Sequence, residues 1–317
     1  MNTVYLIVTE SCNMSCPFCY NYFTDPNFKT PDKILDADFA AAVINKGYKS
    51  KDDYSPFDYV VFHGGEPLLY PRTILEIIDK VQGSKKYSLQ TNLNYKELSK
   101  DQIEVLCKLG AYGTSYSYDR FESNEQALVN MVNNVRFLSS LNLKCTLIVT
   151  LTEMQLQRQN PWALRNFIYK ELPTLDYIIF ERPIYSIEEI DKDPEKYKQI
   201  YHKVDNYLCQ AVDAFGETNF RTNLLSQVSD ALKHKTTVYQ KKCSRFTITV
   251  YPDKHIKFGC PSKENTKIIY YDEEFYQNCL LCEYFKYCKM DCECFNYVCA
   301  FPKKYFKKVS EMYLKGK

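Results

Sequence analysis

Short apolar runs alternate with amphipathic segments along the first 182 residues. Runs such as Val4–Val8 and Tyr59–Phe62 are apolar at nearly every position, which is typical of strands buried on both faces. We expect six strands, at Val4–Val8, Tyr59–Phe62, Tyr87–Thr91, Gly113–Tyr118, Leu143–Leu151 and Tyr177–Phe180. Helical patterns lie between them, at Ala37–Tyr48, Pro71–Val81, Lys100–Leu109, Asn124–Ser140 and Pro161–Lys170. Six βα-type units in a row predict an α/β fold with a parallel sheet and right-handed crossovers, as an open or closed (β/α) barrel.

The pattern changes after residue 182. An irregular connection, Pro183–Asp193, precedes two helical patterns at Pro194–Phe215 and Asn223–Lys235. Beyond Cys243, two short β-type runs flank a Pro-Asp-Lys turn and predict a hairpin, Phe246–Tyr251 with His255–Phe258. The last pattern is a helix at Lys303–Leu314. We therefore divide the chain into a barrel at 1–182, a helical connection at 183–240, a cysteine-rich domain at 241–301 and a basic terminal helix at 302–317.

Composition excludes several classes of protein. Of 317 residues, 45% are apolar and 25% are charged, which excludes a disordered chain. A net charge of +2 gives no basic field for nucleic acid, and no apolar run approaches the roughly 18 residues of a membrane span. The N-terminus lacks the features of a signal peptide, so we expect a cytoplasmic protein. The six lysines of 302–317 form either a solvated helix face or a docking surface for an acidic partner.

Fourteen cysteines are the unusual feature of the composition. Without an export signal they do not predict a disulfide framework, and in a reducing compartment such a number indicates metal or iron–sulfur ligation. Three lie within residues 12–19 and eight lie within 243–299. The other three are isolated in apolar segments, and we interpret them as core thiols: Cys107, Cys145 and Cys209.

The first group has the spacing C-x3-C-x2-C, at Cys12, Cys16 and Cys19, and begins four residues after the first predicted strand. Three thiolates on one short loop can bind three irons of a [4Fe–4S] cluster and leave the fourth iron open to another ligand. The alternative is a zinc site, which would lack its fourth ligand.

A second motif, His63-Gly64-Gly65-Glu66-Pro67, directly follows the second predicted strand. The chain has only nine glycines, where an average composition gives roughly 22, so two adjacent ones are notable. Missing Cβ atoms let a ligand lie against the backbone, and Glu66 can pair with a ligand ammonium. The alternative is an ordinary turn at the end of a strand.

Polar residues also follow the other predicted strands. In a (β/α) barrel the active site forms where the carboxyl ends of the strands meet the following loops. The residues at these ends are Gln90-Thr91-Asn92, Ser117-Tyr118-Asp119, Thr150 with Thr152, and Glu181 with Arg182. Each is individually consistent with a solvated turn, but together they favour one site.

The cysteine loop after the first strand and Gly-Gly-Glu-Pro after the second resemble the radical S-adenosylmethionine superfamily over roughly residues 1–182. The resemblance implies a partial (β/α)6 barrel. It implies that Cys12, Cys16 and Cys19 bind a [4Fe–4S] cluster whose open iron chelates S-adenosylmethionine. An electron from the cluster would then cleave this cofactor to a 5′-deoxyadenosyl radical, which abstracts a substrate hydrogen atom.

The resemblance also assigns roles to single residues. The residues that it implies for cofactor binding are Phe18, Gly64, Gly65, Glu66, Pro67, Gln90, Asn92 and Ser117. Asp119 would face the substrate, and Arg182 would bind a carboxylate of the cofactor or of the substrate. Two positions depart from the family pattern, because Leu93 replaces a glycine and Arg120 replaces a small residue.

The tail extends the resemblance. Cys279-x2-Cys282-x5-Cys288-x3-Cys292 looks like the core of the SPASM extension of that superfamily, which carries two auxiliary [4Fe–4S] clusters. By resemblance, Cys279, Cys282, Cys288 and Cys299 would bind the second auxiliary cluster. Cys243, Cys260 and Cys292 would bind the first, with Cys294 either its fourth ligand or a spare thiol. The alternative is a pair of zinc-ribbon-like sites.

The resemblance predicts an oxidoreductase that modifies a ribosomal peptide by a thioether or carbon–carbon crosslink. The partners it implies are a peptide or protein substrate, a flavodoxin- or ferredoxin-type electron donor and a separate leader-peptide recognition protein, unless the 183–240 helices serve that purpose. Alternatives are a sulfatase-type maturase or a small-molecule radical dehydrogenase. An alternative of another class is a non-catalytic iron–sulfur electron-transfer protein.

Overall fold

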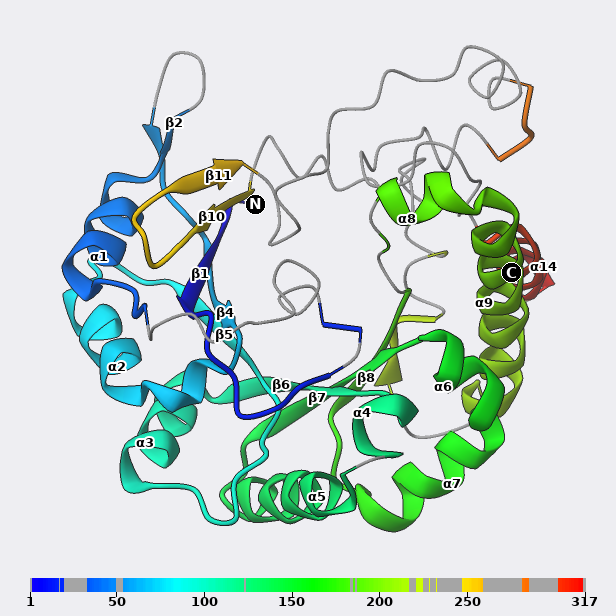
Figure 1. Cartoon of the computed structure of the whole chain (residues 1–317), viewed down its shortest axis with the longest axis horizontal. Coiled ribbons are helices and arrows are strands. Elements are labelled where there is room, and N and C mark those ends of the chain that lie inside the picture. The colour runs from blue at the N-terminus through cyan, green and yellow to red at the C-terminus, as the bar shows by residue number, and fades with distance from the viewer. Residues whose placement is uncertain are drawn as a thin grey trace. The chain divides into compact units, whose positions relative to one another are not determined.

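The structure is a computed structural model (Figure 1). It describes residues 2–16, 18–19, 33–49, 54–122, 124–182, 185, 187–216, 221–224, 228, 232, 247–258, 281–284 and 302–315. The chain divides into two compact units. The first comprises residues 1–147, 174–176 and 243–262, and the second comprises 148–173, 177–242 and 263–317. The four domain limits expected from the sequence stay predictions.

The first unit alternates strands and helices as predicted. Its elements are β1 (Thr3–Thr9), α1 (Ala37–Lys46), β2 (Tyr48–Lys49), β3 (Tyr54–Ser55), β4 (Tyr59–Gly64), a 3-10 turn η1 (Pro67–Leu69), α2 (Pro71–Lys80), β5 (Lys86–Thr91), α3 (Lys100–Leu109), β6 (Ala111–Tyr116), α4 (Tyr118–Glu122), α5 (Glu125–Ser140), β7 (Lys144–Thr150), β10 (Thr247–Val250) and β11 (Ile256–Phe258). The last three residues of β7 belong to the second unit. The predicted strands and helices are confirmed, while α4 and the β2–β3 hairpin are too short to show a period in the sequence.

The strand order in this unit is β11-β10-β1-β4-β5-β6-β7. β1 pairs in parallel with β4, β4 with β5 and β5 with β6, which confirms the predicted parallel sheet. The predicted terminal hairpin is also confirmed, since β10 and β11 are antiparallel. Its first strand joins the sheet in parallel beside β1, where Thr3 lies opposite Thr247. This long-range pairing has no signal in the local sequence.

Apolar side chains from strands and helices form the core of the first unit. Val4, Leu6 and Val8 share one face of β1 and are fully buried, and Ile7 on the other face is 2% exposed. α2 directs Ile74 and Ile77 inward and keeps its charged positions outside. Burying one such side chain contributes about 2 kcal/mol, so the sheet needs no metal or disulfide to hold it together.

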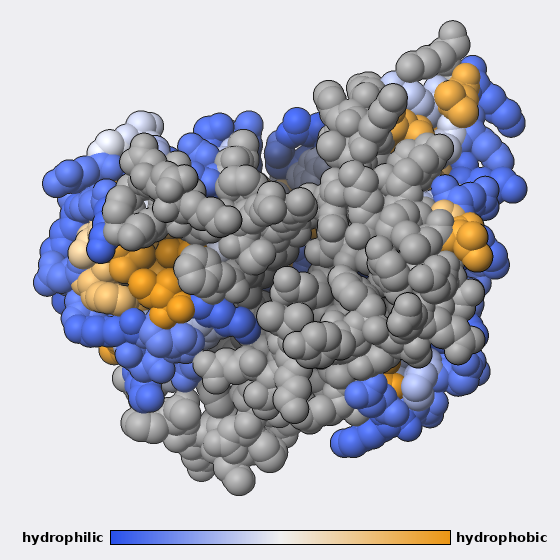
Figure 2. All heavy atoms as spheres, turned by 90° about the horizontal axis from the view of Figure 1, so that it is seen from above, coloured by the Kyte–Doolittle hydropathy of each residue, from blue (hydrophilic) through white to orange (hydrophobic). Residues whose placement is uncertain are grey.

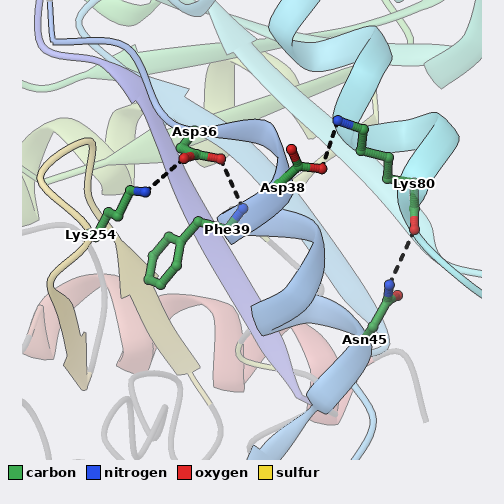
Figure 3. Close-up of polar contacts among 6 residues, drawn as sticks. All are labelled: Asp36, Asp38, Phe39, Asn45, Lys80 and Lys254. Atoms are coloured by element: carbon green, nitrogen blue, oxygen red, sulfur yellow. Dashed lines mark hydrogen bonds and ion pairs between the residues drawn. The ribbon is translucent and has the colours of Figure 1, made fainter.

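A salt bridge connects the β10–β11 hairpin to the start of α1 (Figure 3). Asp36 is the N-cap of α1, and its Oδ1 accepts a hydrogen bond of 3.0 Å from the backbone N–H of Phe39. The other oxygen, Oδ2, lies 2.7 Å from Nζ of Lys254 at the hairpin turn. One carboxylate thus caps a helix and fixes a hairpin more than 200 positions away.

The second unit is mainly helical. Its elements are the end of β7, α6 (Glu153–Arg158), α7 (Pro161–Glu171), β8 (Tyr177–Glu181), α8 (Ile187–Lys192), α9 (Pro194–Phe215), β9 (Arg221–Thr222) and α14 (Lys303–Lys315). β8 pairs in parallel with β9, and α7, α8 and α14 pack on α9. Asp205 of α9 caps α14, since its carboxylate accepts from the backbone N–H groups of Lys304 and Tyr305.

The second unit differs from the sequence prediction between residues 183 and 193. The connection 183–193 was expected to be irregular, but α8 lies inside it. This expectation was wrong because Ile190 is buried and α8 packs on α9, a tertiary contact that stabilises a helix too short to show a period. The expected helix at 223–235 falls mostly outside the described residues.

On the face that Figure 2 shows, the described residues are mostly hydrophilic, and hydrophobic side chains gather in separate patches. The half-exposed large apolar side chains of the first unit are Ile34, Val129, Phe137, Leu141 and Ile256. Among the helices that the structure describes, none is long and apolar enough to span a membrane.

Candidate functional site

The three cysteines of the first motif follow β1 on one loop, residues 10–19, which we call the cysteine loop. Within it the N–H of Cys19 donates to the carbonyl of Cys16 at 3.0 Å, which forms a turn. Cys16 is buried, Cys19 is half-buried and Cys12 is partly open to solvent, and all three are free thiols. The loop therefore presents the three thiols from one short segment at the carboxyl end of β1.

The thiols are close enough to influence one another electrostatically. The protein packed around Cys12 raises the pKa of its thiol to about 12, although part of the residue is open to solvent. The charge of Glu66 raises this pKa further, as do Cys16 and Cys19. Burial also raises the pKa of Cys16, while the nearby Arg120 lowers it. A thiol with a raised pKa holds its proton, so metal binding at this loop must release protons.

No three His, Cys, Asp or Glu side chains among the described residues form a group that could hold a single metal ion. A [4Fe–4S] cluster differs from a single ion because each thiolate binds a different iron. The residue types and the shared loop fit such a cluster.

Gly64 and Gly65 lie against the cysteine loop itself. The N–H of Gly65 donates to the carbonyl of Thr9, and the N–H of Glu66 donates to that of Ser11, each at 2.8 Å. A Cβ on Gly65 would lie 2.2 Å from the carbonyl oxygen of Ser11, and Gly64 has a φ of +132° that other residues rarely adopt. The room left by the missing Cβ of Gly65 is thus occupied by the chain's own backbone, whereas the sequence suggested a ligand there.

Glu66 is fully buried and its carboxylate faces donors of the protein. Oε1 accepts from the N–H of Leu68 at 3.0 Å and from the hydroxyl of Thr91 at 2.8 Å, and Oε2 accepts from the N–H of Asn92 at 2.7 Å. Burial raises the pKa of Glu66, and these hydrogen bonds partly offset the rise. The side chain therefore joins the ends of β4 and β5.

Asn92 extends this connection to the cysteine loop. Its Nδ2 donates to Oδ1 of Asn13 at 2.7 Å and lies 3.5 Å from Sγ of Cys12. Asn13 in turn donates to the carbonyl of Asn94 at 2.8 Å. The structure thus brings two sequence-predicted residues, Glu66 and Asn92, into one hydrogen-bonded network that reaches Cys12.

Leu93 has a left-handed backbone, with a φ of +53°, at the position where the resembling family has glycine. Its side chain is fully buried, and its N–H donates to the hydroxyl of Thr91. Asn134 of α5 donates to the carbonyls of Leu93 and Tyr95. Burial and these hydrogen bonds keep a leucine in a conformation that glycine adopts without strain.

Three polar side chains on adjacent strands form a row. Gln90 of β5 donates to Oγ of Ser115 on β6 at 2.8 Å and also hydrogen-bonds with His63 of β4. The Nδ1 atom of His63 accepts from the N–H of Gly64 at 2.8 Å, and burial lowers the pKa of His63 to about 4. His63 is therefore neutral at pH 7. Sequence reasoning gave it no role, although its place directly before Gly64 was a signal.

Ser117 and Asp119 follow β6, as predicted. Ser117 is fully buried, and its Oγ has no hydrogen-bond partner among the described residues. Because buried hydroxyls nearly always have partners, this atom fits contact with a polar ligand. Asp119 is half-buried and its charge raises the pKa of Cys16, so it lies near the cysteine loop.

The remaining predicted residues are more scattered. Phe18 is half-buried in the cysteine loop, and Pro67 is buried at the start of η1. Thr152 caps α6, which accounts for its polar side chain. Arg182 follows β8 in the second unit, so its place in the site stays a prediction.

Of the eight predicted tail ligands, only Cys282 is described, as a half-buried free thiol. The other seven lie outside the described residues: Cys243, Cys260, Cys279, Cys288, Cys292, Cys294 and Cys299. The auxiliary clusters therefore stay a prediction.

Residues 6–124, which contain the cysteine loop and the ends of β4, β5 and β6, match the family model of the Radical SAM superfamily. A relative, an uncharacterized protein of Archaeoglobus fulgidus, is 29% identical over 132 residues, which are 39% of this chain and 28% of the relative. The match thus spans under a third of that relative's length.

Two crystal structures of Streptococcus suis SuiB, one of them bound to S-adenosylmethionine, are similar to this chain. The similarity covers 92% of this chain and 72% of the SuiB chain, with TM-scores of 0.52 and 0.51. At 14% and 15% identity it shows a shared fold.

Proposed function

Because residues 6–124 match the family model of the Radical SAM superfamily, we propose that this chain is a radical S-adenosylmethionine enzyme that oxidatively modifies a ribosomal peptide. The observation that carries the proposal is the cysteine loop, which presents three thiols after β1 and contacts the ends of β4 and β5. The backbone N–H of Glu66 donates to Ser11, and Asn92 lies against the thiol of Cys12. A polar strand-end turn alone does not require this arrangement.

In this proposal Cys12, Cys16 and Cys19 bind the [4Fe–4S] cluster. Ser117, Gln90 and the backbone of Gly64–Pro67 bind S-adenosylmethionine, with Phe18 beside its adenine. When bound, the cluster supplies the electron that splits S-adenosylmethionine into methionine and a 5′-deoxyadenosyl radical. Within the described part of the chain the Oγ of buried Ser117 has no hydrogen-bond partner, which supports the assignment because a ligand hydroxyl would satisfy it.

The chain's own residues orient this site. Glu66 and Asn92 hold the end of β5 against the cysteine loop, which fixes the thiol of Cys12 relative to β4 and β5. His63 is neutral at pH 7, so the row it forms with Gln90 and Ser115 offers dipoles without charge. Asp119 would face the substrate, and Arg182 would bind a carboxylate.

The finer part of the proposal concerns the tail. Its eight cysteines would bind two auxiliary [4Fe–4S] clusters, which would take an electron from the substrate radical as a thioether or carbon–carbon crosslink forms. A flavodoxin- or ferredoxin-type donor would reduce the first cluster, and a separate protein would deliver the leader peptide. The cysteine count and the fold shared with SuiB support this part.

The central test is whether the anaerobically reconstituted protein converts S-adenosylmethionine into 5′-deoxyadenosine with a strong reductant. We expect this product from the wild type and none from Cys16→Ala, which removes a thiolate of the triad. Cys107→Ala is the matched control. The interpretation of Cys107 as a core thiol was wrong, because it is an exposed thiol on α3, so this variant should keep activity. Zinc in place of iron and sulfide at the triad would contradict the proposal.

A second measurement tests the substrate class. Incubation with a candidate precursor peptide should produce a mass loss of two hydrogens together with 5′-deoxyadenosine. Cleavage of S-adenosylmethionine without any change in peptides would refute the peptide substrate and leave the radical chemistry intact. The Cys16→Ala variant also separates an enzyme from an electron carrier. If it keeps the iron of its tail but no longer cleaves S-adenosylmethionine, the chain is an enzyme and not an electron-transfer protein.

A further inference from the structure

Arg120 lies between the end of β6 and the cysteine loop. It is on α4, and its Nη1 donates to the carbonyl of Ser115 at 2.9 Å. The guanidinium also hydrogen-bonds with the thiol of Cys16. Its Cζ lies 5.6 Å from the ring centroid of Phe18, within the range of a cation–π contact. One side chain thus contacts a strand end, a cysteine and an aromatic ring of the loop.

Arg120 is half-buried and carries a permanent charge. A guanidinium has five N–H donors and does not lose its proton in proteins. The Nε atom is buried and has no hydrogen-bond partner among the described residues. A nearby negative charge stabilises such a cation, and Cys16, which hydrogen-bonds with the guanidinium, would supply this charge as a thiolate once a cluster binds. The negative charge of Asp119 acts on the same cysteine.

We propose that Arg120 is a positioning residue that sets the reduction potential of the iron–sulfur cluster bound at Cys16, a role that rests on the proposed function. Reduction adds one negative charge to a cluster. A fixed cation that donates to a ligand sulfur stabilises the reduced form, which raises the reduction potential. The stacked Phe18 and the carbonyl of Ser115 keep the guanidinium in place. A small residue at this position would remove this cation from beside Cys16.

The test is the midpoint potential of the N-terminal cluster in the reconstituted holoenzyme, measured by redox titration of its electron paramagnetic resonance signal. The signal is identified as the one missing from Cys16→Ala. We expect Arg120→Gln to shift the midpoint to a more negative potential, and Arg120→Lys, which keeps a positive charge, to shift it less. A midpoint in Arg120→Gln equal to that of the wild type would overturn the inference.

Arg165 offers a matched control. It lies on α7 in the second unit, donates from Nη1 to the carbonyl of Ala214 at 3.3 Å and also has a buried Nε without a partner in the described residues. Arg165→Gln removes the same chemistry without removing a cation from Cys16, so the midpoint should stay unchanged. An equal shift in Arg165→Gln would show a general structural effect and would refute the role of Arg120.

A second measurement does not depend on how well Arg120→Gln folds. In wild-type holoenzyme with 15N-labelled arginine, pulsed paramagnetic resonance should detect a 15N coupling to the reduced cluster. The coupling should be missing from labelled Arg120→Lys. No coupling in the wild type would overturn the proposed contact. If the wild type forms no cluster at the triad, the proposed function fails together with the inference, whereas a normal cluster with an unchanged midpoint refutes Arg120 alone.

Discussion

Glu66 combines full burial with negative charge and acts on several groups. It accepts hydrogen bonds from backbone N–H groups after two different strands, and its charge raises the pKa of Cys12. The carboxylate therefore belongs to the support of the cysteine loop, in addition to any contact with a ligand.

Glu66→Gln tests this support. The amide keeps the shape of the side chain, but its NH2 group must face the N–H of either Leu68 or Asn92, so that a donor meets a donor. We expect a loss of about 2 kcal/mol in the free energy of unfolding, measured in urea. Glu76→Gln on the exposed side of α2 should change it little. Equal stability of the two variants would contradict the role of Glu66.

Leu93 makes a second prediction at the residue scale. Leu93→Ala removes a buried side chain and should cost about 3 kcal/mol of unfolding free energy. Leu93→Gly also removes it but relieves the left-handed backbone, so it should be more stable than Leu93→Ala by about 1 kcal/mol. At buried Leu89 of β5 we expect the opposite: Leu89→Gly should be less stable than Leu89→Ala, because glycine weakens an extended strand. Urea unfolding of the four variants measures both differences.

At the scale of elements, carboxylates that cap helices also connect segments distant in sequence. Asp36 caps α1 and pairs with Lys254 of the β10–β11 hairpin, while Asp205 of α9 caps α14. Two lysines of the basic helix contact α9 as well, since Lys304 donates to Asn206 and Lys308 pairs with Asp213. Two of the lysines of α14 therefore interact with polar side chains of α9.

The Asp36–Lys254 pair predicts a pH dependence. The carboxylate of Asp36 accepts a hydrogen bond from Lys254, and this bond is the largest of the effects that lower the pKa of Asp36 below its ordinary value of 3.8. Since the folded-state pKa is the lower one, the stabilisation is fully present above the ordinary value and is lost as pH falls through the lowered value. We expect Lys254→Gln to accelerate amide exchange in β10 and β11 at pH 7, and this difference to vanish at strongly acidic pH.

The ion pair between α1 and α2 offers a matched control. Lys80 pairs with Asp38, two residues after Asp36, and does not contact the hairpin in Figure 3. Lys80→Gln should therefore leave amide exchange in β10 and β11 unchanged. High salt should reduce the effect of Lys254→Gln, because both partners are partly exposed. Equal exchange in the two variants would show that the salt bridge does not hold the hairpin.

At the scale of the whole molecule, the core of the first unit is built from apolar side chains. Val4, Leu6, Val60, Phe62 and Leu89 are fully buried on adjacent parallel strands, and helices cover them. This differs from small metal-dependent domains, which unfold when the metal is removed.

We therefore expect the helices and strands to persist after removal of iron. The far-UV circular dichroism of chelator-treated, reduced protein should be close to that of the reconstituted protein, and so should that of Cys16→Ala. The visible absorption of the cluster should be lost in the same samples, which verifies removal. Loss of most of the helical signal together with the iron would contradict a metal-independent core.

Much of the fold could be predicted from the sequence, because apolar periodicity is local. The runs at Val4–Val8 and Tyr59–Phe62 are buried parallel strands, and Gly110 ends α3 in a left-handed conformation. The pairing of β10 with β1 and the helix α8 could not be predicted, because their stability comes from contacts with segments distant in sequence.

The sequence by itself determined the spacing of Cys12, Cys16 and Cys19 and their place after a buried strand, since covalent connection fixes both. Only the tertiary structure decided that the missing Cβ of Gly65 makes room for the backbone at Ser11, and that Arg120 contacts Cys16. These residues are tens or more than a hundred positions apart, and their proximity follows from the parallel register of β1, β4, β5 and β6, which packing of the whole unit sets.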